Sequence, residues 1–482
     1  MAVVKSAVEF SGRKVLMLGI GILGGGIGMA QYCARHGATL RITDLRSPEH
    51  LQVAFSALSD IDPEYILGRH REEDIDWADI VIRNPGVPPD HPLLERARAQ
   101  GKPVDMEMAF FIRNCPARLI AVTGTKGKTT TTTVLYEFLR TANPAIGLAG
   151  NMGTSAIDLL DGLSPADEVL LEVSSYQLEG LVADPGRISI ALITNVDDDH
   201  LDRYGSLEAY RRVKASIGKA QASDDWLILP AWDGELMELC RPYPSRKAFV
   251  RAGPADPAGA GSAADGVQVT VADGKVHWHE PGEPARCIAD LRGLRLLGSH
   301  NQLNVAFAAA AAHAAGRWPA DVTSAVGSLQ PVPHRLEPVA SAGRVNFIND
   351  SAASAPLAVV AALEALAGRK AVVIAGGDDK SADTEPMLAA LDKVQAPVVI
   401  LPGTMQQHLM SALARRPYQY PVVEAASMSD AVRRAYDLAK ADPAIEVVLL
   451  SPGFSSHSAF INEFDRGAQF REAAARISLE VP

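Results

Sequence analysis

Residues 119–139 read Leu-Ile-Ala-Val-Thr-Gly-Thr-Lys-Gly-Lys-Thr-Thr-Thr-Thr-Thr-Val-Leu-Tyr-Glu-Phe-Leu. An apolar run, a short glycine-containing stretch at 123–130 and a helix-like run follow one another, which predicts a strand, a loop and a helix. A glycine loop between a strand and a helix directs backbone N–H groups at one point and makes a concave anion site. This stretch therefore indicates an α/β fold with a phosphate-binding loop.

Two side chains of the loop have positions suited to a bound nucleotide. Lys128 would reach the β- and γ-phosphates, and Thr129 would hold Mg²⁺. The full pattern has a glycine where this chain has Val122, so the loop is a shortened variant, Gly-x-x-Gly-Lys-Thr. An ordinary glycine turn capped by a threonine is the alternative. The predicted nucleotide-binding residues of the loop are Gly124, Thr125, Lys126, Gly127, Lys128, Thr129 and Thr130.

Length and composition narrow the class of protein. A chain of 482 residues is long enough for three domains, and 47% hydrophobic with 21% charged residues is ordinary for a globular protein. The net charge of −11 argues against general nucleic-acid binding. Four cysteines without Cys-x-x-Cys spacing, and no apolar stretch suited to a signal peptide or a membrane span, predict a soluble, cytoplasmic protein with no membrane partner.

The chain alternates strands and helices in three regions, which predicts three α/β domains: 1–113, 114–331 and 332–482. In the first, a strand at 14–18, glycines at 19, 21 and 24, and a strand ending at Asp44 form a Rossmann-like βαβ unit close to the dinucleotide fingerprint. We expect a linker around 110–116.

The middle region predicts a mostly parallel sheet with strands at 119–123, 168–173 and 190–195. A loop at 252–266, a hairpin at 267–279 turning at Ala-Asp-Gly, and an alanine-rich helix at 302–315 follow. The last region predicts a second Rossmann-like sheet with strands at 345–348, 370–375, 397–401 and 446–451.

Carboxylates and a histidine end two strands of the middle region. Glu172 closes one strand, and the next is followed by Asn-Val-Asp-Asp-Asp-His at 195–200. Such side chains face the phosphate loop in an open α/β sheet, and their oxygens and imidazole could hold Mg²⁺ beside ATP. A surface or capping histidine and a solvated aspartate turn are the alternatives.

Further polar motifs carry weaker signals. Lys214 on a helix is most simply a solvated lysine, and Arg335 in a Pro-His-Arg-Leu-Glu turn could clamp a phosphate or belong to a linker. Lys380 follows a buried strand and could bind a carboxylate, whereas Ser456 and His457 could add hydrogen bonds or sit in a satisfied turn.

In this order the motifs resemble those of the Mur ligase family, specifically its glutamate-adding branch. The resemblance runs nearly end to end. The matching motifs are 150–153, 171–179, 195–204, 298–301, Asn304, 333–337, 349–351, 376–383 and 450–452.

The resemblance implies a role for each site residue. Lys128, His200 and Lys214 would be catalytic, and the metal site would comprise Thr129, Glu172, His200 and Lys214, the lysine as a carbamate. Asn304, Arg335 and Asp350 would bind ATP with the loop. The remaining substrate contacts would be Gly19, Gly21, Gly24, Asp44, Arg46, Asn151 and Ser174 for the uridine-nucleotide substrate, and Ser354, Lys380, Ser456 and His457 for glutamate.

The implied reaction joins glutamate to UDP-N-acetylmuramoyl-L-alanine in peptidoglycan precursor synthesis, with ATP and Mg²⁺ and through an acyl phosphate. The substrates are small molecules, and we expect a monomer. Two segments depart from the D-glutamate pattern: the usual lysine is replaced by Ala352, and the usual Ser-Pro-Ala-x-Ala-Ser stretch reads Ser-Pro-Gly-Phe-Ser-Ser at 451–456. Because both segments would surround the glutamate, we expect L-glutamate as the acceptor, with D-glutamate as the alternative.

Three other functions compete with this interpretation. A NAD-dependent oxidoreductase would use the glycines at 19–24 but leave Lys128, Glu172 and His200 without a role, and a lone glycine fingerprint is a weak signal. A folate or amino-acid polyglutamylating ligase generally lacks a uridine-binding N-terminal domain. A non-catalytic nucleotide-binding protein is expected to have lost its metal ligands, which are present here.

Overall fold

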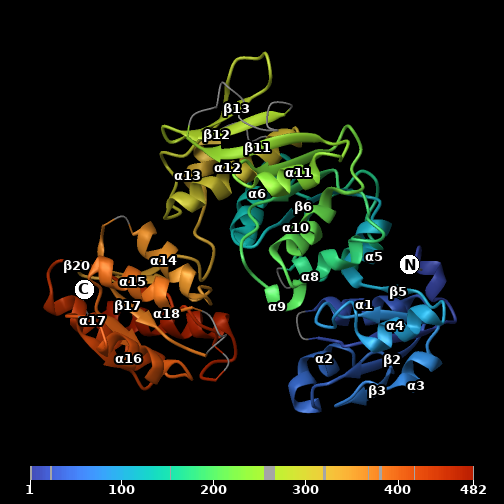
Figure 1. Ribbon diagram of the computed structural model, residues 1–482, viewed down its shortest axis with the longest axis horizontal. Helices are drawn as coiled ribbons and strands as arrows, with labels where there is room; N and C mark the ends of the chain where they lie inside the picture. Colours follow the sequence, from blue (N-terminus) through green and yellow to red (C-terminus); the bar gives the residue numbers. More distant parts are fainter. Residues whose placement is uncertain are drawn as a thin grey trace. The chain divides into compact units, whose positions relative to one another are not determined.

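The structure is a computed structural model that describes residues 3–21, 24–151, 154–253, 266–317, 322–366, 368–378, 383–416, 418–456 and 458–480. The chain folds into two compact units. The first comprises Met1–Gly293 and Leu303–Val326, and the second comprises Leu294–Gln302 and Gly327–Pro482. The first unit holds two sheets and the second holds one (Figure 1), which confirms the predicted α/β class with three sheets.

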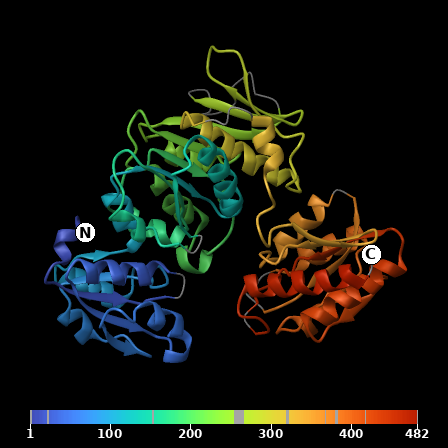
Figure 2. The ribbon, with the colours of Figure 1, turned by 180° about the vertical axis from the view of Figure 1, so that it is seen from behind.

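The N-terminal sheet has the parallel order β3-β2-β1-β4-β5. Its strands are β1 (Lys14–Leu18), β2 (Thr39–Asp44), β3 (Glu64–Leu67), β4 (Ile80–Arg83) and β5 (Val104–Asp105). Its helices are α1 (Gly25–Arg35), α2 (Gln52–Ala57), α3 (Glu72–Trp77) and α4 (Pro92–Ala99). Alternate residues of β1 enter different cores, Val15 and Met17 beside α1 and Leu16 and Leu18 beside α3 and α4, because strand side chains alternate between faces. Figure 2 shows these helices packed on the blue sheet.

The predicted linker at 110–116 is wrong over most of its length. Residues Glu107–Asn114 form helix α5, and Phe110, Phe111 and Ile112 on it are buried. These side chains join a core shared with the N-terminal and central sheets. Apolar burial made this stretch a helix, and only 115–117 connects it to the next strand.

The central sheet contains nine strands of the described chain in the order β14-β13-β12-β11-β10-β9-β6-β8-β7. The strands from β7 to β12 pair in parallel, as predicted, and β12, β13 and β14 pair antiparallel at one edge (top of Figure 1). Their bounds are β6 (Arg118–Thr123), β7 (Gly147–Gly150), β8 (Glu168–Glu172), β9 (Ile190–Ile193), β10 (Trp226–Pro230), β11 (Arg246–Ala252), β12 (Val267–Ala272), β13 (Lys275–His279) and β14 (Arg286–Asp290).

The predicted hairpin at 267–279 is confirmed, because β12 and β13 flank a turn at Asp273 and Gly274, which both have positive φ. The loop predicted at 252–266 lies almost wholly outside the described residues. The alanine-rich helix begins three residues earlier than predicted, at Ser299. The helices of this part are α6 (Lys128–Ala142), α7 (Ile157–Leu160), α8 (Ser175–Leu178), α9 (Leu201–Tyr204), α10 (Leu207–Ala215), α11 (Gly234–Cys240), α12 (Ser299–Ala314) and α13 (Val322–Ser328).

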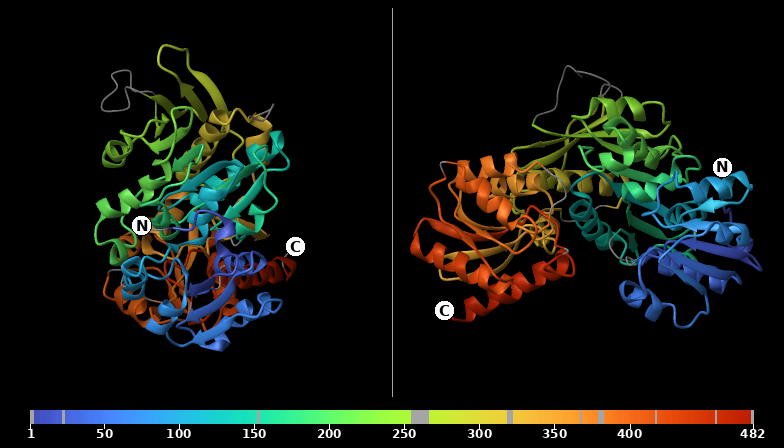
Figure 3. Two further views of the ribbon diagram at one scale, coloured as in Figure 1. Left: turned by 90° about the vertical axis from the view of Figure 1, so that its right-hand side faces the viewer. Right: turned by 60° about the horizontal axis from the view of Figure 1, so that its bottom comes forward.

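The C-terminal sheet has the order β15-β16-β20-β17-β18-β19, parallel except for β15. Val373 on β17 packs with α14, α15 and α16, whereas Val372 and Ile374 pack with α17 and α18, so helices cover both faces (Figure 3, right). The strands are β15 (Glu337–Ala342), β16 (Val345–Asn349), β17 (Lys370–Ala375), β18 (Val398–Ile400), β19 (Val422–Glu424) and β20 (Ile445–Leu450). The helices are α14 (Pro356–Ala365), α15 (Glu385–Val394), α16 (Gln406–Ala414), α17 (Met428–Ala441) and α18 (Glu463–Glu480).

Within the described residues, no helix has the length and apolar character needed to cross a membrane.

Candidate active site

The phosphate loop connects β6 to α6 at the carboxyl edge of the central sheet. Gly124 has φ 152° and Gly127, at the start of α6, has φ 79°, in the left-handed region that favours glycine. A Cβ on Gly124 would lie 1.9 Å from Thr194 Oγ1, and one on Gly127 would lie 2.4 Å from Asn304 Oδ1. Both glycines are therefore needed for the close approach of the loop to its neighbours.

The end of strand β9 holds the loop in place. Thr125 N donates to Asn195 O at 2.9 Å, and Lys126 N donates to Asn195 Oδ1 at 2.9 Å. Thr194 Oγ1 donates to Lys126 O at 2.6 Å. Lys128 Nζ lies over the loop and donates to the carbonyls of Gly124 and Thr125 at 3.0 Å each. The loop is thus fixed by neighbouring backbone and places a cation and the N-terminus of α6 at one point, as an anion site requires.

Glu172 ends β8 beside the loop, since β6 pairs in parallel with both β8 and β9. Its side chain is buried, and Asn151 Nδ2 donates to Oε1 at 3.0 Å. The second oxygen, Oε2, is buried and has no hydrogen-bond partner. A buried carboxylate oxygen without a donor is costly unless a cation binds it, so this residue fits the predicted metal site.

His200 precedes α9 with φ 53°, an uncommon conformation for a residue other than glycine. Its Nδ1 forms a hydrogen bond of 2.9 Å with the Tyr176 hydroxyl. Burial lowers the pKa of the imidazole, which favours the neutral form that ligates metals. When Nδ1 carries the proton and donates it to Tyr176, the lone pair of Nε2 is left for a cation.

Lys214 on α10 is not the solvated lysine that spacing alone suggested, because its side chain is only 1% exposed. Nζ donates to Gly124 O at 2.7 Å and to Thr123 Oγ1 at 3.3 Å. Burial holds the pKa of the amine well below its ordinary value, and the charge of Lys128 lowers it further. A neutral amine is the form that can react with CO₂, so this environment suits the predicted carbamate.

The protein side chains that gather here include few of the residue types that usually bind metals. Across the described ranges, no cluster of three or more His, Cys, Asp or Glu side chains has metal-binding geometry. Of these types the predicted set contains only Glu172 and His200, with Thr129 and the carbamate of Lys214 completing it. A Mg²⁺ bound here would therefore depend on the modified lysine and on substrate oxygens for the rest of its shell.

Asn304 on α12 also lies at the loop. Its Oδ1 accepts from Thr131 Oγ1 at 3.4 Å, within the first turns of α6. The same oxygen would collide with any side chain at Gly127. The structure therefore brings Asn304 to the phosphate loop, where it was predicted to act.

Five of the seven predicted contacts to the uridine-nucleotide substrate lie in or beside the glycine loop after β1, namely Gly19, Gly21, Gly24, Asp44 and Arg46. Gly19, Gly21 and Gly24 all have positive φ. Asp44 Oδ2 accepts from Ile20 N at 3.1 Å, and its Oδ1 accepts from the backbone N of Arg46 at 2.9 Å. Asp44 thus shapes this loop, and the exposed Arg46 lies beside it.

Asn84 in the loop after β4 packs on the same glycines. A Cβ on Gly21 would lie 2.7 Å from Asn84 Nδ2, and one on Gly19 would lie 3.0 Å from Asn84 Cβ. The loop at 84–87 therefore forms a wall of the predicted nucleotide pocket. Asn84 was not among the predicted site residues, although its Asn-Pro-Gly-Val turn directly follows a buried strand.

The other two predicted contacts to the uridine-nucleotide substrate, Asn151 and Ser174, lie at the ends of β7 and β8. Asn151 joins Glu172 through its side chain, as above, and its N–H donates to Glu172 O at 2.8 Å. Ser174 caps α8, with a capping box that includes Gln177. Both residues therefore lie close to the predicted metal ligand.

The second unit contains a strained turn at Arg335. His334 has φ 64° and Leu336 has φ 45°, so two left-handed residues flank the arginine. His334 N donates to Glu337 Oε2 at 2.9 Å, and Leu336 N donates to Asp350 Oδ1 at 3.2 Å. Backbone strain of this kind persists only when surrounding contacts enforce it, so the turn is a built feature and not an ordinary linker.

Asp350 follows β16 and is buried. Burial raises the pKa of its carboxyl to about 7. Ser451 Oγ donates to its Oδ2 at 2.9 Å. Arg335 and Asp350, both predicted to bind ATP, are thus joined within the second unit through Leu336.

The predicted glutamate-binding residues are described in part. Ser354 is half-buried and Ser456 is buried, whereas Lys380 and His457 lie outside the described residues. Ala352, which replaces the usual lysine, donates its N–H to His334 O at 3.0 Å. The substituted segment thus adjoins the strained turn.

A buried arginine joins the two segments that depart from the D-glutamate pattern. Arg466 on α18 donates to Ser351 Oγ and O at 3.0 and 2.8 Å and to Phe454 O at 3.0 Å. Arg466 was not among the site residues predicted from the sequence. Tyr176, which follows Glu172 by four residues, was not among them either. No local pattern distinguishes these two, because their role depends on the partners that the fold brings to them.

Comparison with known proteins agrees with this geometry. The family model named Mur ligase MurD-like, N-terminal domain matches residues 13–105, the Mur ligase middle domain matches 122–312, and the Mur ligase, glutamate ligase domain matches 334–454. A relative with 38% identity extends over 96% of this chain. The chain therefore belongs to the Mur ligase family. It is an ATP-dependent ligase that forms amide bonds.

Among its relatives, proteins named UDP-N-acetylmuramoylalanine–D-glutamate ligase are 38% identical in Roseiflexus sp. and 33% identical in Symbiobacterium thermophilum. The matches cover 96% and 97% of this chain and 98% of each relative. The solved UDP-N-acetylmuramate–alanine ligase of Thermotoga maritima aligns with a TM-score of 0.56 at 19% identity over 96% of this chain and 99% of that one. This last likeness shows the fold alone.

The expectation of L-glutamate finds no support in these relatives, because both names specify D-glutamate. The substitutions at Ala352 and at 451–456 led to that expectation. The family assignment also removes the oxidoreductase interpretation, since the glycines at 19–24 lie in a domain that matches the MurD-like N-terminal model.

Proposed function

We propose that this chain joins D-glutamate to UDP-N-acetylmuramoyl-L-alanine, in the cytoplasm and as a monomer, in the synthesis of a peptidoglycan precursor. One structural observation carries the catalytic part. At the carboxyl edge of one sheet, a phosphate loop lies beside a buried carboxylate oxygen that has no partner, at Glu172. The acceptor and donor are proposed from the names of relatives that match over nearly the whole chain.

The phosphate loop would bind the β- and γ-phosphates of ATP. Backbone N–H groups at the start of α6 and the ammonium of Lys128 supply positive charge to the transferring phosphoryl group. Because Lys128 Nζ now bonds to two loop carbonyls, it can turn to phosphate oxygens by a local rotation of its flexible side chain. Asn304 would add a polar contact from α12.

Glu172 and His200, with Thr129 and the carbamate of Lys214, would hold Mg²⁺. The ion would neutralise charge on phosphate oxygens. Three of the four ligands have support from this chain: Glu172 has a buried oxygen without a partner, burial lowers the pKa of the His200 imidazole, and the Lys214 amine is buried.

The reaction proceeds in two displacements. The alanyl carboxylate attacks the γ-phosphorus of ATP, which forms an acyl phosphate and releases ADP. The amine of glutamate then attacks the acyl carbon, loses a proton, and phosphate leaves as the amide forms. Lys128 stabilises the charge that develops on the phosphoryl group in the first step.

The uridine-nucleotide end of the substrate would bind the N-terminal sheet. Asp44, Arg46 and the glycines at 19, 21 and 24 line the loop after β1, while Asn151 and Ser174 lie nearer Glu172. Glutamate would bind the second unit near Ser354 and Ser456, with Lys380 and His457 as further contacts.

Phosphate release with ATP, Mg²⁺ and UDP-N-acetylmuramoyl-L-alanine tests the proposal, with D-glutamate and L-glutamate compared at equal concentration. We expect turnover with D-glutamate and little with L-glutamate. Turnover with L-glutamate alone would refute the proposed acceptor and revive the interpretation drawn from the substituted segments. If neither enantiomer of glutamate supported turnover, the proposal that this chain joins glutamate to UDP-N-acetylmuramoyl-L-alanine would be refuted.

A further inference from the structure

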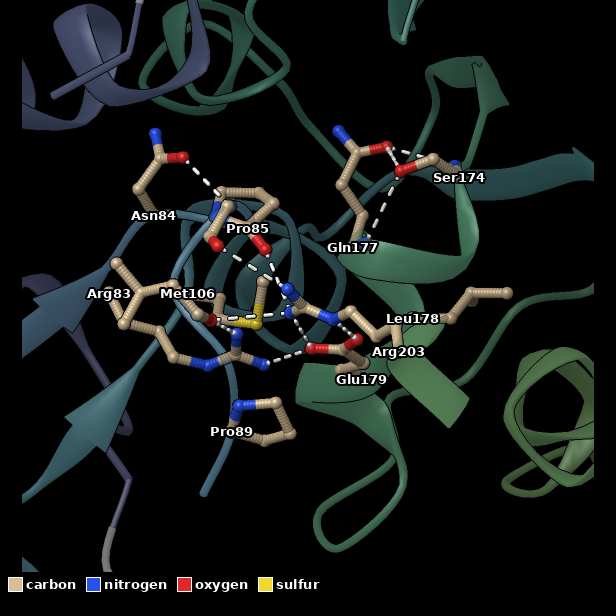
Figure 4. A network of polar contacts seen from close by, with 12 residues as sticks. Arg83, Asn84, Pro85, Pro89, Met106, Ser174, Gln177, Leu178, Glu179 and Arg203 are labelled. Atoms are coloured by element: carbon tan, nitrogen blue, oxygen red, sulfur yellow. Dashed lines mark hydrogen bonds and ion pairs between the residues drawn. The ribbon is translucent and has the colours of Figure 1, made fainter. Parts of the chain in front are cut away.

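A buried charge network joins the N-terminal sheet to the central sheet (Figure 4). Glu179, which follows α8, accepts at Oε2 from Arg83 Nη2 and from Arg203 Nη2, both at 2.8 Å. Its Oε1 accepts from Arg203 Nε at 2.8 Å and from the Tyr204 hydroxyl at 3.1 Å. The side chains of Arg83 and Glu179 are 4% exposed and that of Arg203 is 11% exposed, so little solvent screens these contacts.

Arg203 also holds the loop at 84–87, which walls the predicted nucleotide pocket. Its Nη2 donates to Pro85 O at 2.9 Å and to Val87 O at 3.2 Å, and its Nη1 donates to Gly86 O at 3.3 Å. Arg83 Nη1 donates to Val87 O at 2.6 Å from the other side. One guanidinium from the central domain therefore contacts three consecutive carbonyls of the loop, and Arg83 shares the last of them.

The same guanidinium lies over an aromatic ring that supports the metal site. The Arg203 guanidinium carbon is 4.7 Å from the centroid of Tyr176, within cation–π range. The hydroxyl of Tyr176 is hydrogen-bonded to His200 Nδ1 at 2.9 Å. The backbone of His200 is in the left-handed region, which surrounding contacts must enforce, and the Tyr176 hydroxyl is a contact that orients the His200 ring.

The donors of Arg203 are directed to Glu179 and to loop carbonyls, so the residue is suited to hold other groups and not to contact substrate. We infer that Arg203 is a positioning residue that places the 84–87 loop and the imidazole of His200 together, so that one side chain sets the geometry of both the uridine-nucleotide pocket and the cation site. The inference rests on the proposed function, which gives the loop and the imidazole their ligands.

Two binding measurements on the full chain test this inference without turnover. One follows UDP-N-acetylmuramoyl-L-alanine by calorimetry, and the other follows Mn²⁺ in the presence of ADP by the electron paramagnetic resonance signal of free Mn²⁺. The variants are Arg203→Gln, Arg203→Lys and Tyr176→Phe. Arg212→Gln on the neighbouring helix α10 is the matched control, because Arg212 forms an ion pair with Glu208 in which both side chains are well exposed.

Arg203→Gln should weaken both affinities, each by about tenfold or more, since loss of a support for a metal-bound histidine costs roughly 10–100-fold. Arg203→Lys keeps the charge but not the planar fork, and should weaken both to a smaller extent. Tyr176→Phe removes only the hydroxyl on His200. It should weaken Mn²⁺ binding while the affinity for the uridine nucleotide stays within about twofold, a separation that general loss of structure would not produce.

Three outcomes would overturn the inference. The first is Arg203→Gln with wild-type Mn²⁺ affinity, which would show that Arg203 supports the 84–87 loop but not the cation site. The second is Tyr176→Phe with wild-type Mn²⁺ affinity, which would break the proposed connection even if the arginine variants failed to fold. The third is a wild-type chain that binds neither probe, and this result would refute the proposed function together with the inference. Wild-type binding and turnover with unchanged variants would refute the inference alone.

Discussion

Asp350 offers the sharpest test of how burial in the second unit serves the proposed site. Its carboxyl accepts from Leu336 N and Ser451 Oγ, and burial raises its pKa to about 7. The unfolded chain has the ordinary value near 3.8. Between these two pH values the folded protein holds one more proton at this carboxyl than the unfolded chain, so the free energy of unfolding falls as pH rises.

The gap between the two pKa values sets the size of the effect. A gap of about three pH units corresponds to a total loss on the order of 4 kcal/mol, complete once the pH exceeds the folded pKa. Roughly 2–3 kcal/mol of this falls between pH 5 and pH 8. A side chain that stays neutral over this pH range makes no pH-dependent contribution to the free energy of unfolding, so a protein with such a group here should not lose this stability.

Asp350→Asn supplies such a group at the same position. The amide oxygen can accept from Leu336 N, and the amide nitrogen can donate to Ser451 Oγ, so the buried contacts have partners. We expect the variant to gain stability relative to the natural protein as pH rises from 5 to 8, by roughly 2–3 kcal/mol. ATP-dependent turnover should fall in the same variant, because the family resemblance predicts that Asp350 binds ATP.

Hydrogen exchange of strands β16 and β20 is the appropriate assay, since these paired strands flank Asp350 and report opening of the second unit. Fluorescence would be less informative, because Trp77, Trp226, Trp232 and Trp278 lie in the first unit. Asp437→Asn on the exposed side of α17 is the control. Equal pH dependence of opening in the natural protein and in Asp350→Asn would refute the reasoning.

Three further predictions concern the central site. Lys128→Ala should lower ATP-dependent phosphate release by at least roughly 100-fold, since a cation on the transferring phosphoryl is removed; normal release would contradict the loop assignment. Lys214→Ala should lose activity that added bicarbonate does not restore, and undiminished turnover would disprove its role as a carbamate. Gly127→Ala should cost about 1–2 kcal/mol of stability in urea unfolding followed by tryptophan fluorescence, because its φ is 79° and an added Cβ would lie 2.4 Å from Asn304 Oδ1; an unchanged midpoint would contradict the argument that this position requires glycine.

The sequence predicted the elements whose signal is local. The strand–loop–helix at 119–139 has its period and its glycines within one short stretch, and β1 and β17 have the predicted bounds. The hairpin at 267–279 was equally clear from the sequence, because its turn contains Asp and Gly, which tolerate positive φ. Asp273 and Gly274 adopt positive φ in the structure. In α5, burial and not periodicity decided the structure, and the linker predicted at 110–116 is wrong.

The order of motifs along the chain was sufficient to indicate the family, because each motif is short and chemically distinctive; the roles of the site residues stay predictions. It was not sufficient for the acceptor: substitutions at Ala352 and at 451–456 favoured L-glutamate, while the relatives are named for D-glutamate. Which enantiomer binds depends on the three-dimensional arrangement of contacts around one carbon, which a one-dimensional pattern does not encode.

The sequence by itself determined that this chain has an α/β fold, a phosphate loop at 123–130 and metal-binding residue types at strand ends. Only the tertiary structure showed that Lys214 is buried against the loop, that Glu172 Oε2 lacks a partner and that Arg203 joins the 84–87 loop to Tyr176. The physical reason is that burial, desolvation and the geometry of long side chains depend on segments far apart in the chain, and these meet only when the sheets are packed.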